Sequence, residues 1–287
     1  MSHTGPEPLP SLLVSEPSSV FVADGDLFVP TALAHGPWAE GTLHGGPTGA
    51  LLAHLCERID GGQPTPLRVA RVTVDLLRPV PSTPLRAEVA LARPGRKVDW
   101  VDASLFAGEV EVARASALRV RALPVDLPPG VDPWGRGAAG DQPFEGGPED
   151  GAGFEFSGFD ALPGFHDSGL ELRFVRSNPL ESGPGQLWTR LRYPLVEGVP
   201  TSPLMRVMAC ADMGNAASAL VPQDTHSYIN PDLIVSLWRQ PQGEWVGLDA
   251  VTRVDPAAGA GLAEVALHDQ VGPIGRASQT VLIDQRA

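Results

Sequence analysis

The sequence predicts an α+β protein built from two similar domains, each an antiparallel sheet wrapped around a central helix. Three observations support this prediction. Segments of the first half recur in the same order in the second half. Each half combines one apolar helical run with four strand-like stretches. The chain has 287 residues, of which 43% are hydrophobic, so it is long enough for two cores.

The internal repeat consists of three pairs of segments with similar spacing. Similar segments in the same order at similar offsets indicate a duplicated domain. The pairs are Val72–Arg78 with Leu233–Arg239 (offset 161), Arg114–Leu118 with Arg276–Thr280 (offset 162), and the helical runs at Pro47 and Pro203 (offset 156).

In the first half, a hairpin is expected over Ser19–Pro30, with its turn at Asp24-Gly25-Asp26. A helix follows, with Pro47 in its first turn and Gly61-Gly62 just past its end. Alternation of apolar with charged or small residues then indicates antiparallel strands. These strands are expected at Leu67–Leu77, Leu85–Ala92, Val98–Phe106 and Glu109–Val120.

The second half repeats this order. A helix is expected from Pro203 to about Leu220, capped by Ser202 or Thr201. This helix has almost no polar face, which predicts that it is buried on all sides and that Asp212 lies inside it. Strands are expected at Leu170–Val175, Gln186–Tyr193, Asp232–Arg239, Trp245–Val254, Gly261–Asp269 and Ile274–Ile283.

Residues between the two halves are dense in Gly, Pro and Asp and show no periodicity, which is typical of a linker. The aromatic residues of this linker favour packing on a protein surface. They are Trp134, Phe144, Phe154, Phe156 and Phe159. The predicted organisation is a flexible arm (1–18), a first domain (19–122), the linker (123–168) and a second domain (169–287).

Composition excludes several classes of protein. A net charge of −13 without a basic cluster argues against nucleic acid as a partner. No signal peptide and no apolar run long enough for a membrane helix is present, so the expected location is the cytoplasm. Cys56 and Cys210 lie in apolar runs and are interpreted as reduced core thiols. The histidines lack metal-ligand spacing, so no metal and no other cofactor is expected.

The two copies differ at three polar positions. Taken alone, each of these residues has a structural explanation: Asp212 can face solvent, Asn230 can form a turn before proline, and Gln279 can be an exposed strand residue. Together, a carboxylate and two amides can orient water and stabilise a developing oxyanion, which fits hydrolysis of an activated acyl bond. The positions are Asp212 opposite Cys56, Asn230 opposite Val69, and Gln279 opposite Ala117.

Two further features are candidates for substrate binding. His44-Gly45-Gly46 resembles the oxyanion loop of some serine hydrolases, but the chain has no Gly-x-Ser-x-Gly elbow. The segment is therefore interpreted as the entry to a helix, whose N–H groups can polarise a carbonyl, or as a tight turn. Trp238 is a candidate for lining an acyl pocket, with core packing as the alternative.

Several motifs resemble the thioesterase-like superfamily, in particular double-hotdog proteins similar to bacterial acyl-CoA thioesterase II. The resemblance covers roughly residues 20–285. It rests on Trp38 followed by His44–Ala53, on Arg93–Lys97, and on Tyr228–Asp232, Gly243–Asp249 and Gly275–Gln279. It implies two hotdog domains side by side, with the catalytic Asp and Gln of the family at Asp212 and Gln279. The family's Thr corresponds to Asn230 here.

The resemblance implies hydrolysis of acyl-CoA to free acid and CoA, within lipid metabolism, with water positioned by Asp212, Asn230 and Gln279. The alternatives are a non-catalytic acyl-CoA binder, which the change to Asn230 favours, and an enoyl-CoA hydratase or dehydratase. The latter needs an Asp/His pair, and no His lies near Asp212 in the sequence. A homodimer or higher homo-oligomer of the whole chain, the acyl group and the pathway stay open.

Overall fold

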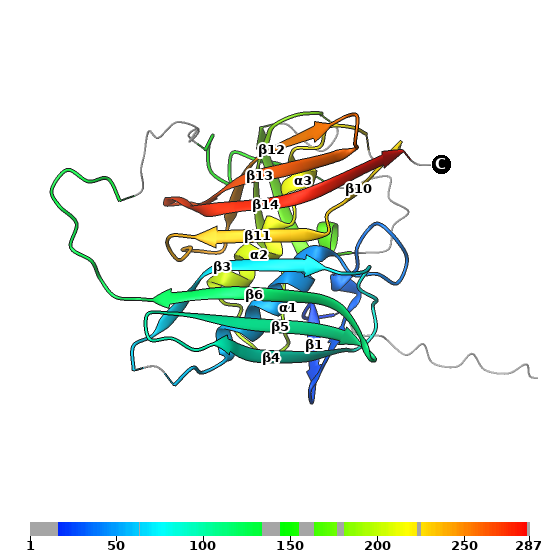
Figure 1. Cartoon of the computed structure of the whole chain (residues 1–287). Coiled ribbons are helices and arrows are strands. Elements are labelled where there is room, and N and C mark those ends of the chain that lie inside the picture. Colours follow the sequence, from blue (N-terminus) through cyan, green and yellow to red (C-terminus); the bar gives the residue numbers. More distant parts are fainter. Residues whose placement is uncertain are drawn as a thin grey trace, which may run out of the picture.

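The computed structural model describes residues 17–62, 64–133, 144–154, 164–176, 181–222 and 225–285. Over these residues the strands form one 14-stranded sheet, mostly antiparallel, with its helices on one side (Figure 1). The strand order is β1-β2-β4-β5-β6-β3-β11-β14-β13-β12-β9-β8-β7, and β10 pairs with β14. Strands from the first half occupy one side of this order and strands from the second half the other.

The first half contains the expected hairpin, helix and four strands. Its elements are β1 (Phe21–Asp24), β2 (Leu27–Pro30), a short 3-10 turn η1 (Ala32–Ala34), α1 (Gly45–Arg58), β3 (Leu67–Leu76), β4 (Leu85–Arg93), β5 (Val98–Ala107) and β6 (Val110–Arg121). One face of α1 packs on β3, β5 and β6, and its apolar side chains are buried there. The prediction of these elements is confirmed to within two or three residues.

The second half repeats the pattern and adds short strands at its margins. Its elements are β7 (Ala152–Gly153), a π-helical turn η2 (Phe165–Gly169), β8 (Leu170–Arg176), β9 (Gly185–Leu191), α2 (Pro203–Ala211), α3 (Gly214–Ala217), β10 (His226–Ile229), β11 (Asp232–Leu237), β12 (Val246–Asp255), β13 (Ala260–Asp269) and β14 (Gly272–Gln285). Strand β10 was not expected from the sequence. The Ser202 side chain caps α2 by accepting from Met205 N, as one of the two predicted caps.

The two halves join through β3 and β11, which lie side by side at the centre of the sheet (Figure 1). Leu233 pairs with Val74 and Val235 with Val72. Because the repeat equates Val72 with Leu233 and Val74 with Val235, each pair is the image of the other. A pseudo-two-fold axis therefore passes near the Thr73–Ile234 pair. The register supports the duplication and gives a double hotdog with one continuous sheet.

The central helix of the second half differs from the prediction. A single helix to about Leu220 was expected, but α2 ends at Ala211 and Asp212 is its C-cap. A new turn, α3, starts at Gly214, where a Cβ would lie 2.5 Å from Val265 Cγ2. The close packing of this glycine against β13 and its low helix propensity explain the break. Asp212 therefore lies at a helix end rather than within a continuous helix.

The described parts of the linker pack on the second half, as its aromatic residues predicted. The Phe144 ring lies 4.6 Å from that of Trp188, and the Phe154 ring lies 5.6 Å from that of Phe174. Trp134, Phe156 and Phe159 lie outside the described residues. The end of the predicted linker, η2, returns to α1 and contributes to the polar cluster described below.

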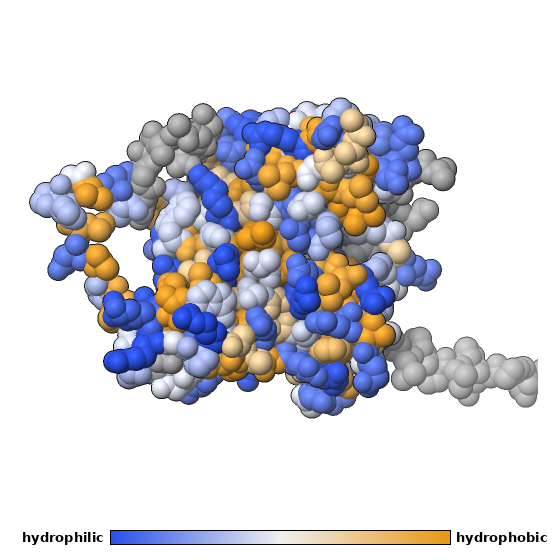
Figure 2. Space-filling view, viewed as in Figure 1, coloured by the Kyte–Doolittle hydropathy of each residue, from blue (hydrophilic) through white to orange (hydrophobic). Residues whose placement is uncertain are grey.

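The sheet face seen in Figure 2 mixes hydrophilic and hydrophobic patches, as expected of strands that bury one face. The opposite face packs on α1 and α2, and fully buried side chains from both layers meet there, such as Leu105 and Leu187 of the sheet and Leu51 and Met208 of the helices. No helix among the described residues has the length and apolar character needed to cross a membrane.

Candidate active site

A buried polar cluster forms where the C-terminal end of α2 meets the N-terminal end of α1. At its centre is Asp212, which is 5% exposed. Asn230 Nδ2 donates to Asp212 Oδ1 at 2.8 Å, and Gln279 Nε2 donates to the same oxygen at 2.9 Å. The three polar residues selected from the sequence are therefore in direct contact. Asn230 comes from the turn before β11 and Gln279 from the middle of β14.

Gln279 also stabilises the break between α2 and α3. Its Nε2 lies 3.3 Å from the backbone oxygen of Asp212, and its Oε1 accepts from Asn215 N at 3.2 Å. The end of a helix leaves backbone groups without partners inside the helix, and Gln279 bonds two such groups. Gln279 is fully buried, as its inward position in the strand alternation suggested. Asn215 carried no signal in the sequence.

The first half contributes a histidine to the same carboxylate. His44 Nδ1 lies 2.8 Å from Asp212 Oδ2. His44 is the N-cap of α1. Gly46 N–H donates to Asp212 and lies 3.1 Å from His44 Nδ1, which can accept from it only when this nitrogen carries no proton. An ionised carboxylate only accepts, so the proton between His44 and Asp212 belongs on Nδ1. In the neutral form of the ring, this leaves His44 Nε2 as an acceptor.

Glycine is required where α1 begins because the two helices approach so closely. A Cβ on Gly45 would lie 2.8 Å from Asp212 Oδ2, and one on Gly46 would lie 2.5 Å from the Ala209 carbonyl oxygen. Neither position has room for a side chain. The His-Gly-Gly segment therefore lets the positive end of one helix lie against the carboxylate at the end of the other.

The contacts of Asp212 favour its charged form. Burial raises the pKa of this carboxyl, but the hydrogen bond from His44, the charge that His44 carries when protonated, and donation from Asn230 and Gly46 outweigh burial and lower the pKa below 3.8. Four donors, from His44, Gly46, Asn230 and Gln279, meet a carboxylate that has about four lone-pair positions. Asp212 is ionised and fully hydrogen-bonded in this arrangement.

The turn η2 completes the surroundings of His44. The Phe165 and His166 rings lie 5.3 and 6.4 Å from the His44 ring. Burial, and secondarily the charge of His44, lower the pKa of His166 to about 4. His166 is therefore neutral near neutral pH. Neither residue was selected from the sequence, because both lie in a segment without periodicity.

The structure brings His44, Gly45 and Gly46 into the cluster, but not Trp238. Asn230 precedes β11 and Trp238 follows it, so a distance along the strand of eight residue steps, on the order of 25 Å, separates them. Trp238 is 39% exposed, and its ring lies under the Arg276 guanidinium. A role for Trp238 in lining this site is not supported by its position.

The sequence argument against an Asp/His pair was wrong, because it considered distance along the chain. His44 and Asp212 belong to different halves, and the close approach of α1 and α2 places them together. The cysteines are fully buried and unpaired with each other, and burial raises the pKa of both thiols to about 12. Within the described residues, no group of three or more His, Cys, Asp or Glu side chains is arranged to hold a metal ion.

The fold and the cluster define a double-hotdog protein with a polar centre at the interface between its halves. Models of two families match the chain: the acyl-CoA thioesterase N-terminal domain over residues 34–120, and the acyl-CoA thioesterase C-terminal domain over residues 139–283. The chain belongs to the acyl-CoA thioesterase family, whose members are thioester hydrolases. A comparison with curated proteins gave no match.

Solved structures share the fold over most of the chain. A putative thioesterase II from Thermobifida fusca is 16% identical, with a TM-score of 0.67 over 93% of this chain and 96% of that one. A putative thioesterase from Novosphingobium aromaticivorans is 19% identical, with a TM-score of 0.62 over 92% and 98%. An acyl-CoA thioesterase II from Mycobacterium marinum is 18% identical, with a TM-score of 0.60 over 85% and 90%.

Proposed function

We propose that the chain hydrolyses an acyl-CoA thioester to the free acid and CoA at the cluster around Asp212. One observation carries this proposal. His44 from the first half and Asp212 from the second half lie 2.8 Å apart in a buried site at the positive end of α1. Such a pair can activate water, and the helix end can polarise a carbonyl. Membership of the thioesterase family supports this reaction class.

We infer that Asp212 acts through His44 rather than on water directly. Its four donors leave the carboxylate no lone pair for a water proton, and its lowered pKa makes it a weak base. His44 Nε2 is the acceptor that remains. Asp212 fixes the tautomer and orientation of His44 and stabilises the imidazolium that forms when His44 takes a proton. This differs from the water-binding role that the sequence suggested for Asp212.

The reaction then has two proton transfers. A water molecule gives a proton to His44 Nε2 while its oxygen attacks the thioester carbonyl carbon. When the carbon–sulfur bond breaks, the imidazolium returns the proton to the departing thiolate. Gly46 N–H is committed to the cluster, so Gly45 N–H is the candidate donor to the oxyanion. No cofactor is required for these steps.

Asn230 supplies a hydrogen-bond donor to the Asp212 carboxylate at the position where the resemblance implies a Thr. Its amide donates to Asp212 Oδ1, and its side chain is half-buried at the outer edge of the cluster. We propose that substrate enters from this side and that Gln279 and Asn230 hold the carboxylate in place. The Asn therefore preserves the geometry of the carboxylate, which favours an active enzyme over a non-catalytic binder.

The proposal is tested by thiol release from acyl-CoA thioesters of varied chain length. Asp212→Ala should lower turnover about 10²-fold or more, because the histidine loses its orienting partner. Asp75→Ala is the matched control, since this aspartate pairs with Arg114 on the sheet and is 43% exposed. Near-normal thiol release by Asp212→Ala excludes the role of the cluster.

The Asp–His pair also fits addition of water to an enoyl-CoA, which makes a hydratase the second candidate. The two reactions differ in readout, because hydration removes enoyl absorbance without releasing thiol. A stable acyl-CoA complex without turnover at enzyme excess would instead indicate a binding protein. Release of thiol with unchanged enoyl absorbance is the result that the proposed function predicts.

A further inference from the structure

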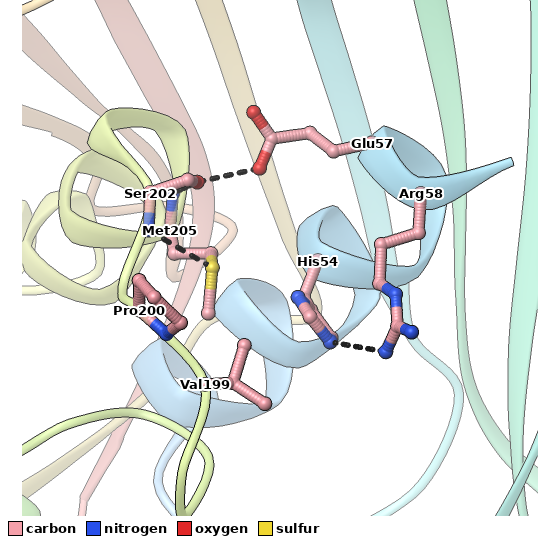
Figure 3. A pocket seen from close by; sticks show the side chains of 7 residues that line it. All are labelled: His54, Glu57, Arg58, Val199, Pro200, Ser202 and Met205. Atoms are coloured by element: carbon pink, nitrogen blue, oxygen red, sulfur yellow. Dashed lines mark hydrogen bonds between the residues drawn. The ribbon is translucent and has the colours of Figure 1, made fainter.

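The pseudo-two-fold axis gives the Asp212 cluster a counterpart at the other end of the helix pair. There the C-terminal end of α1 meets the N-terminal end of α2. The position equivalent to Asp212 is Cys56, which is apolar and fully buried. The next residue, Glu57, instead accepts a hydrogen bond from Ser202 Oγ at the N-cap of α2 (Figure 3). A carboxylate therefore contacts a helix N-terminus at both pseudo-equivalent sites.

A cavity of about 480 Å³ opens at this counterpart site (Figure 3). Two hydrogen-bonded pairs of polar side chains line it, and the other lining side chains are apolar. Glu57 bonds to Ser202, and His54 Nε2 lies 3.4 Å from Arg58 Nη1. The lining residues are His54, Glu57, Arg58, Val199, Pro200, Ser202 and Met205.

The charges around the cavity are nearly balanced. Burial and the neighbouring Arg58 lower the pKa of His54, which is 3% exposed, so its ring is neutral near neutral pH. Burial raises the pKa of Glu57, and donation from Ser202 reduces this effect. The lining therefore carries one carboxylate and one guanidinium among apolar side chains. This composition suits the uncharged end of a thioester, which has a carbonyl group and an apolar tail.

Glu57 differs from Asp212 in being available as a base. Asp212 accepts from four donors, whereas the side-chain hydrogen bond to Glu57 comes from Ser202. The second oxygen of the Glu57 carboxylate is turned away from Ser202 (Figure 3). The raised pKa makes Glu57 a stronger base than an ordinary glutamate. Ser202 is a poor candidate for a nucleophile, because its hydroxyl caps α2 and donates to Glu57.

We propose that this cavity is a second thioester-hydrolysing centre, in which Glu57 activates the water and Arg58 faces the oxyanion. Water oxygen bonds to the carbonyl carbon as one water proton passes to Glu57. The carbon–sulfur bond then breaks, and the thiolate takes that proton. Val199, Pro200 and Met205 contact the acyl group. The inference rests on the proposed function, because the substrate class is taken from it.

The test uses the full chain with its main cluster disabled by Asp212→Asn. This variant should retain a residual thiol release that adding Glu57→Gln lowers about tenfold or more, as expected for loss of a general base. Adding Arg58→Gln should also lower it, and Arg58 is exposed, so that change does not threaten the fold. Glu88→Gln is the control, because this glutamate is 59% exposed on β4 and away from the cavity.

The pH profile of the residual activity adds a second readout. Because the base must be ionised, the residual rate should fall as the pH drops, with an apparent pKa above the ordinary 4.5 of a glutamate. An unchanged residual rate in Asp212→Asn/Glu57→Gln, or no residual rate in Asp212→Asn, overturns the second centre and leaves the proposed function intact. Loss of turnover in Glu57→Gln alone, with none in Asp212→Asn, supports the second centre and refutes the role of the Asp212 cluster.

Discussion

Replacing Asp212 by Asn tests how the cluster holds its charge. The wild-type carboxylate receives Asn230 and Gln279 on Oδ1 and His44 on Oδ2, and Gly46 N–H also donates to it. An asparagine can keep its oxygen toward the two amides and turn its NH₂ toward His44. His44 can then accept at Nδ1 by changing tautomer, but this nitrogen has one lone pair for two donors, the new NH₂ and Gly46 N–H at 3.1 Å, so one buried donor lacks a partner.

The expected cost in stability follows from that count. One buried donor without a partner costs about 1–3 kcal/mol, which for a chain of this size corresponds to a fall in Tm of roughly 2–5 °C. The effect on catalysis should be larger. The tautomer change places the proton on His44 Nε2, so this atom can no longer accept from water. Turnover should fall about 10²- to 10⁴-fold, the usual range for losing a general base.

The two quantities are measured on the same preparation, by thermal unfolding and by thiol release from an acyl-CoA. A cooperative melt a few degrees below that of the wild type, with turnover lowered at least 10²-fold, agrees with the reasoning. Asp75→Asn should change neither quantity appreciably, since Asp75 and Arg114 form an exposed pair. A folded Asp212→Asn protein with turnover within a factor of about two of wild type refutes the role assigned to the carboxylate.

Three other changes test the packing and charge of the fold. Gly45→Ala should lower thiol release about tenfold or more, because its Cβ falls 2.8 Å from the carboxylate, whereas Gly49→Ala meets nothing closer than 3.6 Å and should keep activity. Arg119→Met should lower the unfolding free energy measured in urea by about 3–5 kcal/mol, because it leaves fully buried Asp99 without its bidentate partner. Burial raises the pKa of Asp269, but hydrogen bonds from Arg239 and from backbone amides outweigh burial, so the pKa of Asp269 lies below 3.8. The stability that Asp269 contributes should therefore be present above pH 3.8 and be lost as the pH falls through the lowered pKa, so urea midpoints of wild type and Asp269→Asn should converge in acid.

The repeat made most of the fold predictable. Val72 and Leu233 share an offset with their neighbours, and the register of β3 with β11 shows that this offset is a pseudo-two-fold relation. Alternation within each strand and the cap at Ser202 located the elements, because both are local properties of the sequence. The break after Asp212 was not predictable in this way. It depends on Gly214 packing against β13, which is a tertiary contact.

The site was predictable in its members but not in its connections. Asp212 and Gln279 stood out because the first copy has apolar residues at the equivalent positions. The contact of His44 with Asp212 depends on how α1 lies against α2, which no local pattern encodes. The comparison of the two copies position by position also missed Glu57 as a counterpart of Asp212. The repeat equates Asp212 with Cys56, and the Glu57 carboxylate comes one residue later.

A double-mutant cycle on His44 and Asp212 tests most directly whether one catalytic unit is shared by the two halves. The quantity to measure is kcat/KM for thiol release by wild type, His44→Gln, Asp212→Asn and the double variant. If the carboxylate acts only through the histidine, the double variant should be about as slow as the slower single variant. If the two losses multiply instead, the two residues act independently and the shared unit is contradicted.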